Sequence, residues 1–108
     1  MTLLADLAAA LGVAHVLTGA DLEGYRPDWT HHYTSNPIAV ARPGSTAEVA
    51  EVMQIAARHG VAVIPVSGRT GLVGGAMTDG GLMLSVERLN RIREIRANSR
   101  IAIVEAGV

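Results

Sequence analysis

Glycine is concentrated in one short stretch of this chain, and that stretch constrains the fold more than any other feature of the sequence. Six of the twelve glycines lie within residues 68–81, which read GRTGLVGGAMTDGG. The stretch directly follows VAVIPV at residues 61–66, an apolar run typical of a buried strand. Glycine loses more conformational freedom on folding than other residues, so this density at the end of a strand indicates a loop with a specific task.

The loop has the composition of a diphosphate-binding site. A diphosphate is held by several converging backbone N–H groups, which approach it closely only where no Cβ stands in the way. Thr70 adds a hydroxyl donor, and Arg69 adds a cation that either pairs with the phosphate or points to solvent. A flexible glycine-rich turn between two strands is the alternative. The ordered Thr, Leu and Val between the glycines disfavour it.

Two other kinds of phosphate-binding loop do not match. A P-loop ends in Gly-Lys-Ser or Gly-Lys-Thr, whereas this loop has Gly74, Gly75 and Ala76 in the corresponding region. A Rossmann loop has the spacing G-x-G-x-x-G and opens a helix, but residues 77–81 are typical of a turn. We therefore expect loop amides, and not a helix dipole, to hold the anion.

The residues before the loop predict a β-α-β unit. Residues 38–42 form an apolar run that ends at a Pro-Gly pair, and residues 45–48 have the sequence of a capping box. Gly60 suits the left-handed position after the helix. Because residues 61–66 follow, the two strands should be parallel. The expected apolar stripe of the helix consists of Val49, Val52, Met53 and Ala56.

Further elements are expected on both sides of this unit. Residues 2–11 predict an amphipathic helix, and residues 18–37 an irregular connection. Residues 82–86 predict a third strand, and residues 87–91 a turn or short helix. The apolar face of the first helix should contain Leu3, Leu4, Leu7 and Leu11.

The last part of the chain predicts an antiparallel hairpin, with strands at residues 92–96 and 101–105. Nothing in the sequence covers the last strand, so we expect a partial domain whose exposed strand edges favour homo-oligomers. The alternating charges Glu87, Arg88, Arg91, Arg93, Glu94 and Arg96 are expected on a solvated face.

Composition excludes several classes of function. Nine basic residues stand against ten acidic ones, so no excess positive charge is available for a nucleic-acid partner. Cysteine is absent, which excludes disulfides and thiolate chemistry. The apolar N-terminal run has no preceding basic residue and is too short to span a bilayer, so we expect no transmembrane segment and a cytoplasmic protein.

No catalytic or metal-binding constellation stands out. His31 and His32 are candidate metal ligands or acid-base groups, but no carboxylate or further histidine lies at ligand spacing. His15 and His59 are isolated in the sequence, so all four are expected to be surface histidines. We predict no catalytic residue and no metal ligand in this chain.

From about residue 20 to its end, the chain resembles the FAD-binding domain of the vanillyl-alcohol-oxidase/PCMH-type flavoenzymes. The glycine loop at residues 65–76, PVSGRTGLVGGA, carries most of the resemblance, together with LMLSVERLNRI and the final VEAGV. Asp28 and Trp29, spaced from Tyr25, are similar to the entry segment of the D-2-hydroxyacid dehydrogenase branch, where they would anchor the chain. That branch includes D-lactate and D-2-hydroxyglutarate dehydrogenases and the glycolate oxidase FAD subunit.

The resemblance implies an α+β fold: a PCMH-type FAD-binding subdomain with a β-α-β unit, a glycine-rich loop and a small mixed sheet. Residues 1–37 would be an N-terminal helix and entry segment, and residues 38–108 the first portion of the FAD-binding domain. It also implies that a set of loop residues wraps the FAD diphosphate, and that two strand residues approach the flavin. The loop residues are Pro65, Ser67, Gly68, Arg69, Thr70, Gly71, Gly74 and Gly75, and the strand residues are Leu84 and Ser85.

Two loop positions depart from the family pattern. Ser67 stands where the family often has glycine, and Arg69 where asparagine or glycine is common. The implied function is FAD binding in an oxidoreductase that converts a D-2-hydroxy acid (D-lactate, D-2-hydroxyglutarate or glycolate) to the 2-oxo acid. The substrate site and the electron acceptor would lie outside this segment. A non-catalytic flavin-binding half-domain or interaction module is the alternative.

Overall fold

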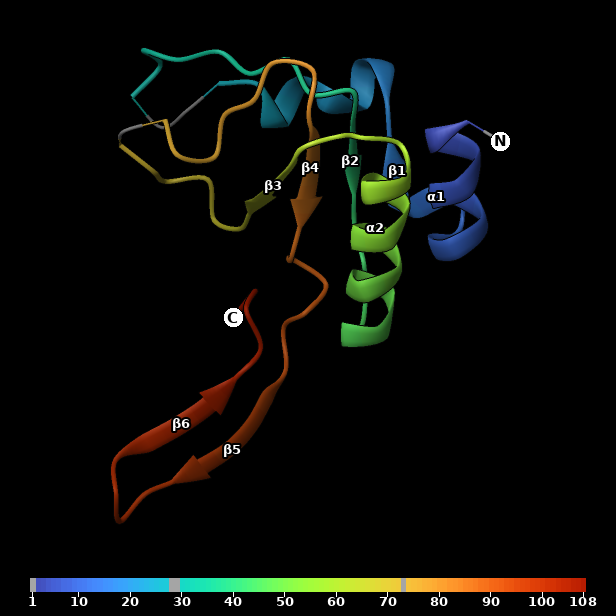
Figure 1. The fold of residues 1–108 in the computed structure, drawn as a ribbon. Coiled ribbons are helices and arrows are strands. Elements are labelled where there is room, and N and C mark those ends of the chain that lie inside the picture. Colours follow the sequence, from blue (N-terminus) through green and yellow to red (C-terminus); the bar gives the residue numbers. More distant parts are fainter. Residues whose placement is uncertain (1, 28–29, 73) are drawn as a thin grey trace.

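The computed structural model describes residues 2–27, 30–72 and 74–108 as a small α/β body from which one β-hairpin projects (Figure 1). Asp28 and Trp29, predicted to anchor the entry segment, lie outside the described residues. The body contains a four-stranded sheet with the order β1-β2-β4-β3. These strands are β1 (Val16–Leu17), β2 (Ala39–Ala41), β3 (Val63–Val66) and β4 (Leu82–Ser85).

The β-α-β prediction is confirmed, with one addition. Both β2 and β3 pair in parallel with β4, so the two predicted strands are parallel but are not neighbours. β4 lies between them. All four of its residues are buried, as expected for the centre of a parallel sheet. β3 takes the edge, where Pro65, which has no N–H to donate, does least harm to the ladder.

The sheet is mixed because β1 pairs antiparallel with β2. The sequence did not predict β1, which is only two residues long. It lies before residue 38, so the sheet crosses the expected boundary between residues 37 and 38, and that boundary stays a prediction. The irregular connection expected over residues 18–37 begins with a 3-10 helix, η2 (Gly19–Tyr25), and a shorter one, η1 (Val13–His15), precedes β1.

The two faces of the sheet carry two separate apolar clusters. Helices α1 (Leu3–Leu11) and α2 (Thr46–Arg58) cover one face, where Leu7, Val52 and Leu82 are fully buried. On the other face Val40 and Met83 pack against η2. Successive strand residues point to opposite faces, which explains why neighbours such as Leu82 and Met83 belong to different clusters.

Two predicted core positions are wrong. Leu4 is 39% exposed and Met53 is 47% exposed, whereas Ile55 is buried against the sheet. Helical spacing permits either side of the stripe to face the core, and the place of α1 beside α2 decides between them. Leu7 and Leu11 are buried as predicted.

Both ends of α2 follow the sequence prediction. The Ser45 hydroxyl accepts a hydrogen bond from the Glu48 amide at 3.1 Å. The Glu48 carboxylate reaches back by one residue more than a standard capping box and accepts from the Gly44 amide at 2.9 Å. Gly60 has a φ of 65°, the left-handed conformation expected after the helix.

A hydrogen bond joins Asp6 of α1 to His59, the residue at the end of α2. His59 Nε2 lies 2.8 Å from Asp6 Oδ2, and both side chains are largely shielded from solvent. His59 is therefore not the isolated surface residue that the sequence predicts. The hydrogen bond to His59 lowers the pKa of Asp6 below its ordinary value.

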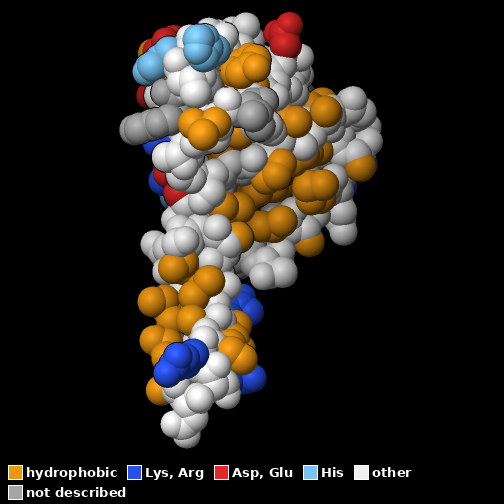
Figure 2. Space-filling model, turned by 90° about the vertical axis from the view of Figure 1, so that its left-hand side faces the viewer, with side chains coloured by type: hydrophobic (Ala, Val, Ile, Leu, Met, Phe, Trp, Pro, Cys, Tyr) orange, Lys and Arg blue, Asp and Glu red, His pale blue; other side chains and the backbone are white. Residues whose placement is uncertain are grey.

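The hairpin consists of β5 (Ile92–Arg96) and β6 (Ile101–Val104), paired antiparallel as predicted. It extends away from the sheet, and hydrophobic side chains gather along its surface (Figures 1 and 2). Ile95 is 69% exposed and Ile92 58% exposed. This exposure is consistent with the expected self-association, which stays a prediction. Within the described part of the chain, no helix is long and apolar enough to cross a bilayer.

The first prediction concerns the N-cap of α2. Replacing Ser45 by Ala removes the acceptor of the Glu48 amide and should lower the free energy of unfolding by about 1 kcal/mol in urea titrations. Thr46→Ala, which removes a neighbouring exposed hydroxyl without a cap bond, is the matched control. Equal stabilities of the two variants would contradict the cap.

The second prediction concerns pH. Because the folded-state pKa of Asp6 is lowered, its pairing with His59 stabilises the fold above about pH 4, and this contribution is lost as the pH falls through the lowered pKa. Urea unfolding at pH 3 to 7 should show a steeper acid loss for the wild type than for Asp6→Asn. Asp21→Asn controls for the loss of one carboxylate. Parallel curves for wild type and Asp6→Asn would refute the linkage.

Candidate functional site

The glycine loop, defined as residues 67–76, begins at the carboxyl end of β3. Because β2, β4 and β3 are parallel, their carboxyl ends lie at one edge of the sheet. This edge brings together the loop, Arg42 after β2 and Glu87 just beyond β4. In open sheets of this kind, ligands bind outside the carboxyl ends of the strands.

A small hollow lies under the loop. Four of the predicted cofactor residues line it: Arg69, Gly71, Gly74 and Gly75. Its other walls come from the open face of the sheet and from η2, and include Val66, Met83 and Tyr25. The hollow has a volume of about 20 Å³, roughly the space of one water molecule. A dinucleotide is far larger than this hollow.

The backbone of the loop fits a diphosphate. Within the described part of the chain, the N–H groups of residues 67–72 have no protein acceptor, so they are available to an anion. A Cβ added at Gly71 or Gly75 would meet no protein atom within 4 Å. The space beside the Cα atoms of these two glycines is thus open, as close approach of a phosphate to the loop backbone requires.

Gly74 is required for a different reason. Its φ is 74°, which L-residues rarely adopt, and an added Cβ would lie 3.4 Å from the ring of Tyr33. Glycine therefore shapes the loop at this position, whereas at Gly71 it keeps space open.

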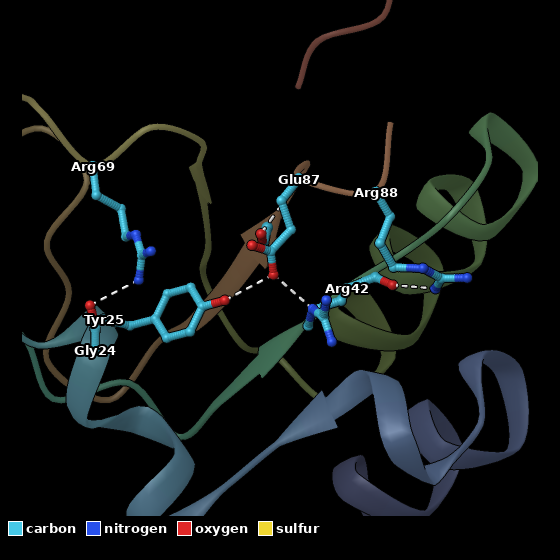
Figure 3. Close-up of polar contacts among 7 residues, drawn as sticks. Gly24, Tyr25, Arg42, Arg69, Glu87 and Arg88 are labelled. Atoms are coloured by element: carbon cyan, nitrogen blue, oxygen red, sulfur yellow. Dashed lines mark hydrogen bonds and ion pairs between the residues drawn. The ribbon is translucent and has the colours of Figure 1, made fainter. Parts of the chain in front are cut away.

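The Arg69 side chain is exposed but makes two contacts with η2. Its guanidinium lies over the ring of Tyr25, with 4.5 Å from Cζ to the ring centroid, and Nη1 donates to the Gly24 carbonyl at 2.8 Å (Figure 3). Arg69 also has a positive φ of 58°. Whether it contacts a diphosphate stays a prediction.

Tyr25 continues these contacts toward the strand ends. Its hydroxyl donates to Glu87 Oε1 at 2.8 Å, and Arg42 Nε donates to the same oxygen at 2.6 Å (Figure 3). Burial alone raises the pKa of Glu87, but the hydrogen bonds from Tyr25 and Arg42 outweigh it and leave the pKa below its ordinary value. Burial, followed by the bond to this carboxylate, raises the pKa of Tyr25.

The sequence prediction missed this network. Glu87 and Arg88 were expected on a solvated face, but Glu87 binds Tyr25 and Arg42, and Arg88 Nη1 donates to the Arg42 carbonyl at 2.6 Å. The sequence did contain a signal for this network. Glu87 and Arg88 come shortly after the buried strand β4, and side chains from distant segments meet at the edge where parallel strands end. The charged residues of β5, Arg93, Glu94 and Arg96, are exposed as predicted.

The remaining predicted residues lie around the hollow without lining it. Ser67, Gly68 and Thr70 are exposed in the loop. Leu84 is buried in the cluster on the helix-covered face, so its side chain points away from the hollow, and Met83 lines it instead. Ser85 is buried, and its hydroxyl accepts from the Glu87 amide at 3.4 Å. Pro65 lies in β3 beside Leu84.

The paired histidines take no part in this arrangement. His31 and His32 are exposed in the connection before β2. Among the described residues, no group of three or more His, Asp and Glu side chains is placed to hold a metal ion.

Two known proteins are similar to most of this chain. D-2-hydroxyglutarate dehydrogenase from Xanthomonas citri pv. viticola is 50% identical over 90 residues, which are 82% of this chain and 19% of that protein. The glycolate oxidase subunit GlcD from Bacillus subtilis is 38% identical over 85 residues, 78% of this chain and 18% of its own length. The chain therefore spans about a fifth of the length of these relatives.

The fold has a close counterpart among solved structures. A structure of p-cresol methylhydroxylase with substrate bound superposes with a TM-score of 0.86 at 26% identity, over 98% of this chain and 22% of that one. The family described as FAD binding domain matches residues 37–108, which include the whole glycine loop and both central strands. The chain therefore belongs to the PCMH-type FAD-binding domain family, and its cofactor is FAD.

Proposed function

We propose that this chain is the diphosphate-binding part of an FAD-dependent oxidoreductase that oxidises a D-2-hydroxy acid to the 2-oxo acid. The observation that carries the proposal is the row of acceptor-free amides over residues 67–72, held at the carboxyl ends of parallel strands. FAD binding follows from the family. The substrate class is supported by similarity to proteins named D-2-hydroxyglutarate dehydrogenase and glycolate oxidase subunit.

In this proposal the loop residues hold the diphosphate by their backbone. Ser67, Gly68, Arg69, Thr70, Gly71, Gly74 and Gly75 form the cradle, and Pro65 starts it at the end of β3. Ser85 and the backbone of Leu84 lie at the same edge, toward the flavin. When bound, the flavin would supply the hydride-transfer chemistry, while the residues of this chain would bind and orient it.

A second candidate function is a non-catalytic half-domain that binds the nucleotide or only packs against a partner. One observation favours packing against a partner: Ile92 and Ile95 are exposed on the hairpin. FAD titration tests this form of the candidate, because a module that only packs against a partner would leave the cofactor unbound.

The third prediction tests the cradle. The purified chain should bind FAD, measured by quenching of flavin fluorescence. Gly71→Ala should weaken binding about tenfold without changing stability, because its Cβ enters only the space in front of the amides. Gly60→Ala should do the reverse, because φ there is positive and the position lies outside the loop. Absence of flavin binding to the wild type would favour the structural module.

The fourth prediction concerns turnover. The chain loaded with FAD should not reduce a dye acceptor with D-lactate or D-2-hydroxyglutarate, because in the proposed function the residues that bind the substrate and transfer its proton lie outside this segment, which spans about a fifth of the similar dehydrogenases. The same assay with one of the similar full-length dehydrogenases is the positive control. Measurable turnover by this chain would overturn the division of roles.

A further inference from the structure

Arg69 has a backbone conformation that is unusual for an L-residue, and its side chain makes two contacts within the protein. It is one of three described residues other than glycine with positive φ, a conformation that L-residues adopt only when their surroundings enforce it. Its guanidinium stacks on Tyr25 and donates to the Gly24 carbonyl (Figure 3). Both contacts bind the loop to η2, some 45 residues earlier in the chain.

Tyr25 is itself held in place. It is 8% exposed, and its hydroxyl is bonded to Glu87, which also binds Arg42. Arg42 and Glu87 follow the two central strands, so a continuous set of contacts runs from the glycine loop through η2 to the rigid centre of the sheet.

We propose that Arg69 is a positioning residue, whose side chain fastens the glycine loop to Gly24 and Tyr25 so that the loop amides are preset for the diphosphate. The inference rests on the proposed function, since it assigns a role within the same cradle. It replaces the simpler idea that the guanidinium pairs directly with the phosphates.

The geometry favours fastening for two reasons. First, the guanidinium already stacks on the ring and donates from Nη1 to a carbonyl, so its position is set by contacts within the protein and only its remaining N–H groups are open to a phosphate. Second, a loop that is already ordered loses less conformational entropy when its ligand binds. The acceptor-free amides of residues 67–72 gain most from such ordering.

The test compares FAD affinity at two salt concentrations for Arg69→Gly, Arg69→Lys and Tyr25→Leu. Fastening predicts about two- to tenfold weaker binding for each, the factor expected for losing a cation–π contact. The salt dependence should stay that of the wild type, and Tyr25→Leu combined with Arg69→Gly should add little further loss. Arg100→Gly, which replaces another exposed arginine of positive φ outside the loop, is the matched control and should bind FAD like the wild type.

Direct pairing predicts a different pattern and would overturn the proposal. Arg69→Lys would retain most of the affinity, Tyr25→Leu would bind like the wild type, and Arg69→Gly would show a weaker salt dependence. Arg69 is exposed in the loop, so its variants decide the question even if Tyr25→Leu fails to fold.

Backbone NMR order parameters give a readout that needs no FAD. Those of residues 67–72 should fall from the rigid range of about 0.85 in the wild type toward about 0.6 in Arg69→Gly. Equal order parameters in the two proteins would overturn fastening. If the wild type failed to bind FAD, the proposed function would fall, while this measurement would still decide the role of Arg69.

Discussion

The pairing of β4 between β2 and β3 is the constraint on which the rest of the structure depends. It buries LMLS at the centre of the sheet and brings three carboxyl strand ends to one edge. The glycine loop leaves from one of these ends, and Arg42 and Glu87 follow the other two. Because β4 pairs with both β2 and β3, it sets the position of the loop relative to the Tyr25–Glu87–Arg42 contacts.

The site has two parts with different physical tasks. The loop backbone offers unpaired N–H groups and open space, which are the properties that bind a diphosphate. The side chains of Arg69, Tyr25, Glu87 and Arg42 contact one another and hold the loop in position. Charged side chains thus contact other protein groups and position the loop backbone, which forms the binding surface. On the opposite face of the sheet, the hydrogen bond between Asp6 and His59 joins α1 to the end of α2.

Local sequence patterns predicted local structure well. The capping box at Ser45, the left-handed Gly60 and the β5–β6 hairpin depend on residues close together in the chain, so their patterns are sufficient. Predictions that depended on distant neighbours were less successful. Met53 and Ile55 both fit a helical stripe, but only the docking of α2 on the sheet decides which is buried. Likewise, the sequence predicted that Glu87 lies on a solvated face, whereas the fold brings Tyr25 and Arg42 close enough to donate hydrogen bonds to it.

By itself, the sequence determined that a glycine-rich loop follows a buried strand, that it is neither a P-loop nor a Rossmann loop, and that it resembles an FAD cradle. Tertiary structure decided that β4 lies between β2 and β3, that His59 contacts Asp6, and that Arg69 stacks on Tyr25. The physical reason is range. Backbone conformation and capping are governed by neighbours within a few residues, whereas the guanidinium of Arg69 meets Gly24 and Tyr25 only because the sheet brings segments 45 residues apart to one edge.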